Sequence, residues 1–401
     1  MIFELILALI LGIIAGTFTG LSPGIHINLV SSLLVLSLGA FSSLPLISLA
    51  VFIVSMSIAH TFLDFIPSIY LGAPEDDTFL AILPGHEMLQ KGEGHTAVMI
   101  TLIGSLFALP FVVLLSPLFI YFLPAVYSSI KSLMPFILIF LSFYIIFRDD
   151  DFILGFIVFS LAGFLGYVTL NLPINESLMP LLTGLFGTSS LIVSLQSKTP
   201  KIRKQKLSKF RFSILSRKEY LEASAASLLS APIFSILPGI SSGHSATFGS
   251  ELIPQSRKGF LFMSGAINTL IMSLSYVTLY AINKSRSGTS VAISNILPKL
   301  TQSDLVIILS AIVLSGILSF IIGIFLSRYL SLVFNKINYK KLTLFVLLFL
   351  FALNFIFSGW LGLVVLITST SLGIFAIESS SRRINLMGAL IVPTIIYFLF
   401  G

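Results

Sequence analysis

The chain has 401 residues, of which 56% are hydrophobic and 10% are charged, and its mean hydropathy is +1.06. A soluble protein of this length needs far more charge to cover its surface, so the composition excludes a soluble globular domain. The chain has no cysteine, which excludes disulfides, thiolate metal sites and cysteine nucleophiles. Apolar runs of helical length, without two-residue alternation, recur from end to end and predict an all-α polytopic membrane protein.

The N-terminal segment, 1–21, has no basic flank and no cleavage signature of small residues, so we expect a retained membrane segment and not a signal peptide. The apolar stretch that begins with this segment is interrupted in mid-membrane by Pro23-Gly24-Ile25-His26, and Asn28 follows the interruption. Proline removes a backbone donor and glycine opens dihedral angles that other residues avoid, so one helix should end here and another begin. The free N–H groups of the new helix can bind an anion. A kink that only packs is the alternative.

The next predicted span, 44–62, contains His60, and Asp64 follows it at the start of a loop over 63–96. Proton coupling through Asp64 is one hypothesis, because an acid inside a membrane usually has a function. A position in an interfacial loop is the favoured alternative. We do not expect His60 and Asp64 to bind a metal, since no third ligand is in view.

Four more spans are predicted before the middle of the chain. They cover 97–123, 132–148, 153–171 and 177–195. Between two of them, Asp149, Asp150 and Asp151 are expected to be solvated loop charges.

A basic stretch, 197–218, separates the two sides of the chain and holds nine of the 23 basic residues with no acid among them. The positive-inside rule predicts a cytoplasmic linker. Binding of anionic lipid or nucleic acid is the less favoured alternative, and no nucleic-acid partner is expected. The linker would divide a first repeat, 1–196, from a second repeat, 219–401.

The second half opens with a similar break, Pro238-Gly239-Ile240-Ser241-Ser242-Gly243-His244. His26 and His244 each follow a Pro-Gly pair, and either could donate to an anion or titrate near neutral pH; a neutral histidine bonded to a helix end is the equal alternative. The segment also matches G-x-S-x-G, but that motif needs a strand, a turn and a helix, so an intramembrane hydrolase built on Ser241 and His244 is not favoured.

The halves match in order and at near-constant offsets. The matching groups are Pro23-Gly24-Ile25 with Pro238-Gly239-Ile240, Ile82-Leu83-Pro84 with Ile296-Leu297-Pro298, Leu165-Gly166 with Leu372-Gly373, and Leu178-Met179 with Leu386-Met387. Spans in the second half are predicted near 259–283, 304–327, 342–358, 361–378 and 386–400. With the linker inside, most basic residues of this half also fall inside, including Arg257 and Lys258, which are expected to be anchors more than anion contacts. Both termini are then outside, and each half crosses the membrane an odd number of times. The prediction is two inverted repeats, each a Pro-Gly-broken hairpin plus about five transmembrane helices, an organisation typical of secondary transporters.

The Gly16/Gly20…Pro23-Gly24 pattern resembles the large membrane subunit of tripartite tricarboxylate transporters. So does Leu71-Gly72-Ala73-Pro74 followed by Pro84-Gly85-His86-Glu87-Met88-Leu89-Gln90-Lys91-Gly92. Asn268 alone could correspond to the acidic-asparagine cluster that the family carries in its second half. The loop Pro-Gly-Ile-Ser-Ser-Gly-His is also similar to the "PGVSGGT" loop of a polyprenyl-phosphate translocase family.

Both resemblances imply a transported anion, either an organic carboxylate or a lipid-linked phosphate. We expect a secondary transporter in the cell membrane, with no cofactor and with coupling to H⁺ or Na⁺. A small membrane subunit and a binding protein would be partners if the system is tripartite, and a homodimer is also compatible with the sequence. The candidate substrate-binding residues are Pro23, Gly24, Ile25, His26, Asn28, Pro238, Gly239, Ile240, Ser241, Ser242, Gly243 and His244. The candidates for coupling or gating are His60, Asp64, Asn268, Arg257 and Lys258.

Overall fold

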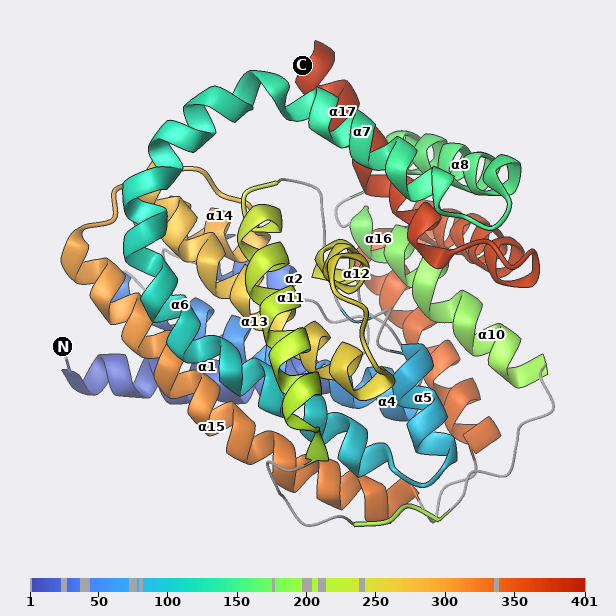
Figure 1. The fold of residues 1–401 in the computed structure, drawn as a ribbon, viewed down its shortest axis with the longest axis horizontal. Helices are drawn as coiled ribbons and strands as arrows, with labels where there is room; N and C mark the ends of the chain where they lie inside the picture. The colour runs from blue at the N-terminus through green and yellow to red at the C-terminus, as the bar shows by residue number, and fades with distance from the viewer. Residues whose placement is uncertain are drawn as a thin grey trace.

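The structure is a computed structural model that describes residues 2–22, 27–36, 44–71, 78, 82–174, 177–196, 204–207, 214–237, 242–334 and 339–400. Over these residues the fold is entirely helical (Figure 1). Eight helices in the described part are long and apolar enough to cross a membrane. They are Ile2–Leu21, Leu46–Tyr70, Gly94–Ser129, Phe152–Leu170, Arg257–Ile282, Gln302–Val333, Thr343–Glu378 and Arg383–Phe400. The chain is therefore a multi-pass membrane protein.

The described residues of the first half form ten α-helices and the two short turns η3 and η4 of other helical types. They are α1 (Ile2–Leu21), α2 (Ile27–Leu36), α3 (Leu46–Leu63), α4 (Phe65–Leu71), α5 (Ile82–Gln90), α6 (Gly94–Ile130), the 3-10 turn η3 (Lys131–Leu133), α7 (Met134–Phe147), α8 (Phe152–Leu170), α9 (Leu178–Leu182), the π-helical turn η4 (Thr183–Thr188) and α10 (Ser189–Gln196). The predicted loop over 63–96 is corrected here, because α4 continues the direction of α3 and α5 follows.

Among the described residues after the linker lie seven α-helices and the 3-10 turn η6. They are α11 (Arg217–Phe234), α12 (Ser242–Leu252), α13 (Arg257–Ile282), α14 (Gly288–Ile296), α15 (Gln302–Phe334), α16 (Tyr339–Glu378), the 3-10 turn η6 (Arg383–Met387) and α17 (Gly388–Phe400). Sequence analysis missed α14. It placed two spans where α16 lies, and α16 is indeed broken at Gly359, whose φ of 64° and ψ of −161° are not helical.

The helices form two lobes, and most helix packing lies within one lobe or the other. The large lobe contains α1, α3, α6, α11, α13 and α15, with the shorter helices α2, α4, α5, α12 and α14. The small lobe contains α7, α8, α10, α16 and α17, which lie together on the right of Figure 1. Each lobe takes helices from both halves of the chain: α6 packs on α13 in the large lobe, and α8 packs on α17 in the small lobe.

Glycines allow the closest approaches between helices. A Cβ on Gly104 of α6 would lie 2.0 Å from the carbonyl oxygen of Phe262, and one on Gly265 of α13 would lie 2.2 Å from that of Thr101. The backbones of α6 and α13 therefore touch, and Ser105 Oγ donates a hydrogen bond to Gly265 O at 3.0 Å across the same seam. Small residues take this role in membranes because tight packing there replaces the hydrophobic effect.

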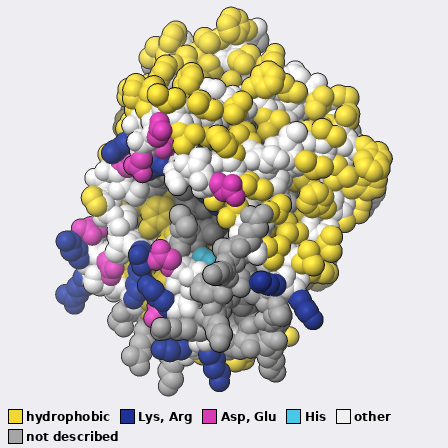
Figure 2. Space-filling view, turned by 90° about the vertical axis from the view of Figure 1, so that its right-hand side faces the viewer, with side chains coloured by type: hydrophobic (Ala, Val, Ile, Leu, Met, Phe, Trp, Pro, Cys, Tyr) yellow, Lys and Arg dark blue, Asp and Glu magenta, His cyan; other side chains and the backbone are white. Residues whose placement is uncertain are grey.

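The outer surface divides into an apolar part and a charged part. Figure 2 shows hydrophobic side chains over most of one face, with Lys, Arg, Asp and Glu gathered toward one end. Lipid tails would contact the apolar part and the charged part would lie at the water interface.

Candidate functional site

The helix that follows the second Pro-Gly break has a buried, polar N-terminus. α11 ends at Phe234 and α12 begins at Ser242, as predicted, and the loop residues Pro238, Gly239, Ile240 and Ser241 lie outside the described residues. Ser242 and His244 are buried, with relative exposures of 2% each, and Ser245 is fully buried. Gly243 is buried with them. Such an N-terminus presents N–H groups and small polar side chains to whatever lies before it.

A guanidinium group reaches the start of this loop. Arg286 Nε donates a hydrogen bond to the carbonyl oxygen of Leu237, the residue before Pro238, at 3.2 Å. Two caps bring Arg286 there: Asn283 ends α13 in the left-handed conformation with φ of 52°, and Ser287 starts α14 with a reciprocal capping box to Ser290. The chain turns sharply between these caps, and the turn carries Arg286. Sequence analysis did not single out Arg286 and missed this contact.

The first break is described only at its edges. α1 ends at Leu21 and α2 begins at Ile27, as predicted, whereas Pro23, Gly24, Ile25 and His26 lie outside the described residues. Asn28 belongs to α2, and the structure does not describe its side chain.

The structure brings Asp64 and Asn268 together, although 204 positions separate them in the chain. Asn268 Nδ2 donates to Asp64 Oδ2 at 2.9 Å, and the two residues are 2% and 1% exposed. The favoured loop position of Asp64 was wrong. Pro67 has no N–H for the carbonyl of Leu63, so the helix bends at Asp64 but continues as one apolar span, Leu46–Tyr70. The carboxyl group therefore lies inside the membrane-spanning part.

His60 lies one turn before Asp64 on α3 and is also buried, with 3% exposure. Its Nδ1 is 3.1 Å from Thr19 Oγ1 on α1, four residues before Pro23. Side chains thus meet in two pairs, Thr19 with His60 and Asp64 with Asn268 of the second-half helix α13, and one helical turn separates His60 from Asp64. Of the five candidates for coupling, His60, Asp64 and Asn268 come together.

The other two candidates, Arg257 and Lys258, lie at the start of α13, away from Asn268 and Asp64. Arg257 Nη1 pairs with Glu87 Oε2 of α5 at 2.6 Å, and Lys258 Nζ donates to the carbonyl oxygen of Ile214 at 3.4 Å. Arg257 thus connects the start of α13 to α5, and Lys258 connects it to Ile214 of the stretch 197–218. Both contacts fit the anchor interpretation.

A second polar cluster, in the small lobe, was missed by sequence analysis. Asp149 is 8% exposed and Oδ2 accepts hydrogen bonds from Ser381 Oγ at 2.8 Å, from the N–H of Arg382 at 2.9 Å and from Asn385 Nδ2. The expectation of a solvated loop charge was therefore wrong for Asp149. Nearby, Glu251 at the end of α12 pairs with Arg148 at 3.4 Å and with Arg382 at 3.8 Å, which links the large lobe to the small one.

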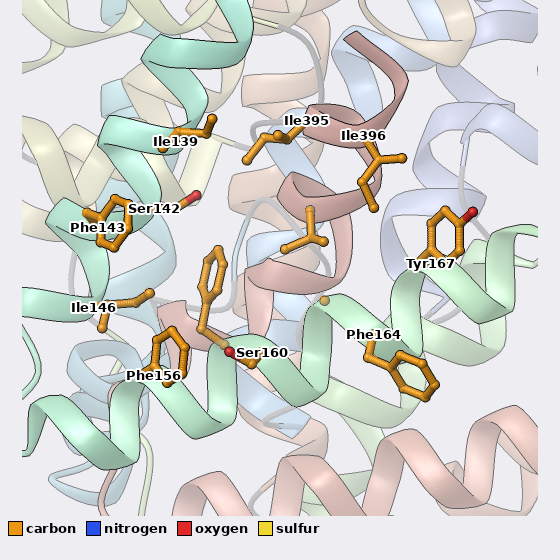
Figure 3. A pocket seen from close by; sticks show the side chains of 13 residues that line it. Ile139, Ser142, Phe143, Ile146, Phe156, Ser160, Phe164, Tyr167, Ile395 and Ile396 are labelled. Carbon is orange, nitrogen blue, oxygen red and sulfur yellow. The ribbon is translucent and has the colours of Figure 1, made fainter. Parts of the chain in front are cut away.

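An apolar pocket of about 430 Å³ lies between α7, α8 and α17 (Figure 3). Phe143, Ile146, Phe156 and Ile395 are typical of its lining, and its hydroxyl groups come from Ser142, Ser160 and Tyr167. Ser142 Oγ already donates to Leu138 O at 2.8 Å. This pocket suits hydrocarbon and not a multiply charged anion.

The comparison with known families decides the class of protein. The family described as "Tripartite tricarboxylate transporter TctA family" matches residues 6–388, nearly the whole chain. The chain belongs to the tripartite tricarboxylate transporter TctA family. It is thus a transporter-type membrane subunit, as the Pro-Gly and His-Glu-Met-Leu-Gln-Lys-Gly motifs indicated. The His-Glu-Met-Leu-Gln-Lys-Gly motif forms the second half of α5 and the turn after it. Its His86 Nδ1 lies 3.3 Å from the carbonyl oxygen of Ile69 of α4.

The chain is also similar to a protein of Methanocaldococcus jannaschii that is described as uncharacterized. The two are 33% identical over 393 residues, which cover 95% of this chain and 96% of the relative. No solved structure matches the chain.

Proposed function

We propose that this TctA-family subunit is a secondary transporter of an organic carboxylate, which binds where the two Pro-Gly breaks meet. The observation that carries the proposal is the contact of Arg286 with Leu237, beside the buried polar N-terminus of α12. A cation, a helix N-terminus and buried hydroxyl groups together attract a carboxylate more strongly than any of them alone. The first break, at the end of α1, would supply the opposing half of the site.

We propose further that the halves, 1–196 and 219–401, are inverted repeats joined by the linker 197–218, and that one lobe moves against the other in alternating access. Matching contacts support this. A Cβ on Gly166 of α8 would lie 1.9 Å from Ala389 O in the other half, and one on Gly373, its partner by sequence, would lie 2.4 Å from Leu185 O in the first half. The ion pairs of Glu251 with Arg148 and Arg382 link the two lobes at one end. The lobes could move against each other there by exchanging these ion pairs, and the packed core of each lobe would stay unchanged.

The proposed orientation has a cytoplasmic linker and both termini outside. It is supported by the side chains that meet at the linker. Gln205 of the linker accepts a hydrogen bond from the N–H of Gly94 at 3.0 Å and donates to Leu89 O at 2.9 Å, so the linker packs on the α5–α6 turn. Arg382 Nη1 also donates to the carbonyl oxygen of Arg148 at 3.0 Å, so the end of α7 meets the chain after α16 at one end of the small lobe. A small membrane subunit and a binding protein outside the membrane would complete the system.

Binding of citrate to the purified full-length protein tests the proposal. Arg286→Gln should weaken binding about tenfold, because a charge-assisted hydrogen bond contributes about 1.5 kcal/mol or more, and Arg286→Lys should recover part of it. Lys299→Gln is the matched control, since Lys299 is an exposed cation beyond α14. Gly24→Val and Gly239→Val should abolish uptake into vesicles while the protein still inserts. Citrate binding by Arg286→Gln equal to that of the control, or normal uptake by both glycine variants, would refute the proposal.

A polyprenyl phosphate is the alternative substrate. The apolar pocket between α7, α8 and α17 favours it, because an isoprenoid chain needs such a surface. The same binding assay separates the two classes. A lipid phosphate should displace citrate only if it shares the site, and Phe156→Ser in the pocket should weaken the lipid alone.

A further inference from the structure

Asp64 is a buried acid within the apolar span Leu46–Tyr70. It is 1% exposed, lies at the bend between α3 and α4, and its carboxylate is bonded by the amide of Asn268 at 2.9 Å. An ionised carboxylate in hydrocarbon is costly unless it is paired, so such an acid is retained where its charge has a task. We infer that Asp64, with Asn268 as its positioning partner, is the group that binds and releases the proton that drives transport; this rests on the proposed function.

The hydrogen bond from Asn268 makes the contact between the two halves sensitive to protonation. Asn268 presents N–H to the carboxylate, and the partial positive charge of an amide N–H stabilises the carboxylate anion. When a proton binds to a carboxyl oxygen, the group becomes neutral and gains an O–H donor. If the proton binds to Oδ1, Oδ2 still accepts from Asn268 but in a weaker hydrogen bond; if it binds to Oδ2, the amide must turn so that its oxygen accepts the O–H. The protonation state therefore changes the strength or the arrangement of a contact between the bend after α3 in the first half and α13 in the second.

Hydrogen bonds fix the backbone around Asp64. Its carbonyl oxygen accepts from Ser68 Oγ at 2.8 Å, and Ser68 Oγ is 2.6 Å from Thr78 Oγ1. One helical turn earlier, His60 contacts Thr19 of α1, which lies four residues before Pro23 in the chain. Asp64 thus lies one turn of helix from a residue that contacts the end of α1.

Other ionisable groups lie on the surrounding helices. On the helices packed around α3 and α4 they include Tyr70 on α4, His86 and Glu87 on α5, His95 on α6, Tyr276 on α13 and Arg328 on α15, besides His60 on α3. Tyr70 is bonded to Ser331, His95 Nδ1 to Ser327 Oγ at 2.9 Å, Glu87 to Arg257, and Tyr276 donates to Thr289 Oγ1 at 3.0 Å. The nearby parts of α1, 17–21, and of α13, 264–272, carry no ionisable side chain. His60 and Asp64 are therefore the pair to separate by mutation.

The first test is an infrared titration of the full-length protein in lipid, which follows the carbonyl stretch of protonated carboxyl groups and needs no substrate. Asp64→Asn should remove one titrating carboxyl band that persists in His60→Gln and in Asp304→Asn, where Asp304 is a half-buried acid at the start of α15. Asn268→Leu should raise the midpoint of that band by about one pH unit, since it removes a donor that stabilises the charged form. If Asp64→Asn retains every titrating band of the wild type, or if Asn268→Leu leaves the midpoint unchanged, the inference is overturned.

The second test uses citrate as the probe in proteoliposomes. An inward proton gradient should accelerate uptake by the wild-type protein at least tenfold, and Asp64→Asn should lose this acceleration while it still exchanges citrate at equal pH. Acceleration retained by Asp64→Asn, or a wild-type protein that responds to a sodium gradient alone, overturns the inference. If citrate and other carboxylates do not bind at all, the proposed function fails by itself, and the infrared titration still decides whether Asp64 is the proton site.

Discussion

Replacing one glycine in the α6–α13 seam should separate close helix packing from helix propensity as a source of stability. In Gly104→Ala the new Cβ would start 2.0 Å from Phe262 O, and it must reach at least 3.0 Å, so the backbones must part by about 1 Å. Overpacking of this kind typically costs about 1–3 kcal/mol, and a contact with a backbone oxygen lies toward the upper end of this range. Lengthening the Ser105–Gly265 hydrogen bond adds about 1 kcal/mol, and the better helix propensity of alanine returns about 1 kcal/mol. The expected net loss is about 2–3 kcal/mol.

The assay is equilibrium unfolding in mixed detergent micelles with an increasing fraction of a denaturing detergent. Gly187→Ala is the control, because its Cβ would meet only Thr183 Cγ2 at 3.8 Å, an ordinary contact. The control should lose no stability. If Gly104→Ala unfolds at the same detergent fraction as Gly187→Ala, the interpretation of the seam as a close backbone contact is refuted.

Three further predictions concern the stability contributed by Gly359, Asp149 and Glu219. Gly359→Ala should lose about 2 kcal/mol from backbone strain alone, because its φ of 64° disfavours a side chain although nothing lies within 4 Å of the new Cβ; unchanged unfolding would contradict this. Asp149→Ala should lose about 3 kcal/mol, since two buried donors and one half-buried donor lose their acceptor, whereas Asp150→Ala, at an exposed residue, should lose little; equal effects would contradict this interpretation. The hydrogen bond from Ser256, followed by those from Ser216, lowers the pKa of Glu219 below its ordinary 4.5. The stability that Glu219 contributes is therefore present above pH 4.5 and lost as the pH falls through the lowered pKa, and Ser256→Ala should flatten this acid-side dependence in thermal unfolding measured against pH; an identical profile would speak against it.

The local breaks and most of the spans could be predicted from the sequence because their causes are local. Proline and glycine end a helix wherever they occur, so α2 and α12 begin where the sequence places them. Hydropathy found the spans for the same reason, since each needs only its own residues. The match of Ile82-Leu83-Pro84 with Ile296-Leu297-Pro298 misled, because the first triplet opens α5 and the second begins at the last residue of α14. Short apolar matches carry little information about position.

The surroundings of individual polar groups could not be predicted, because they depend on residues far away in the chain. Asp64 follows a span and precedes Pro67, a pattern equally typical of a loop. Only the position of Asn268 on α13 shows that the carboxyl group is buried and paired. Asp149 stands in a run of three acids, which suggests exposure, yet its donors come from positions 381–385. Arg286 likewise could not be recognised from the sequence, because two helix caps and the fold around them bring it to the carbonyl oxygen of Leu237.

The sharing of both lobes between both halves has a consequence for how the protein is made. A ribosome completes α3, α6 and α8 well before α13, α15 and α17 exist, so the faces that those later helices cover must first lie against lipid or the insertion machinery. Neither half can complete a lobe by itself. Most of the helix packing therefore forms only after the second half has entered the bilayer.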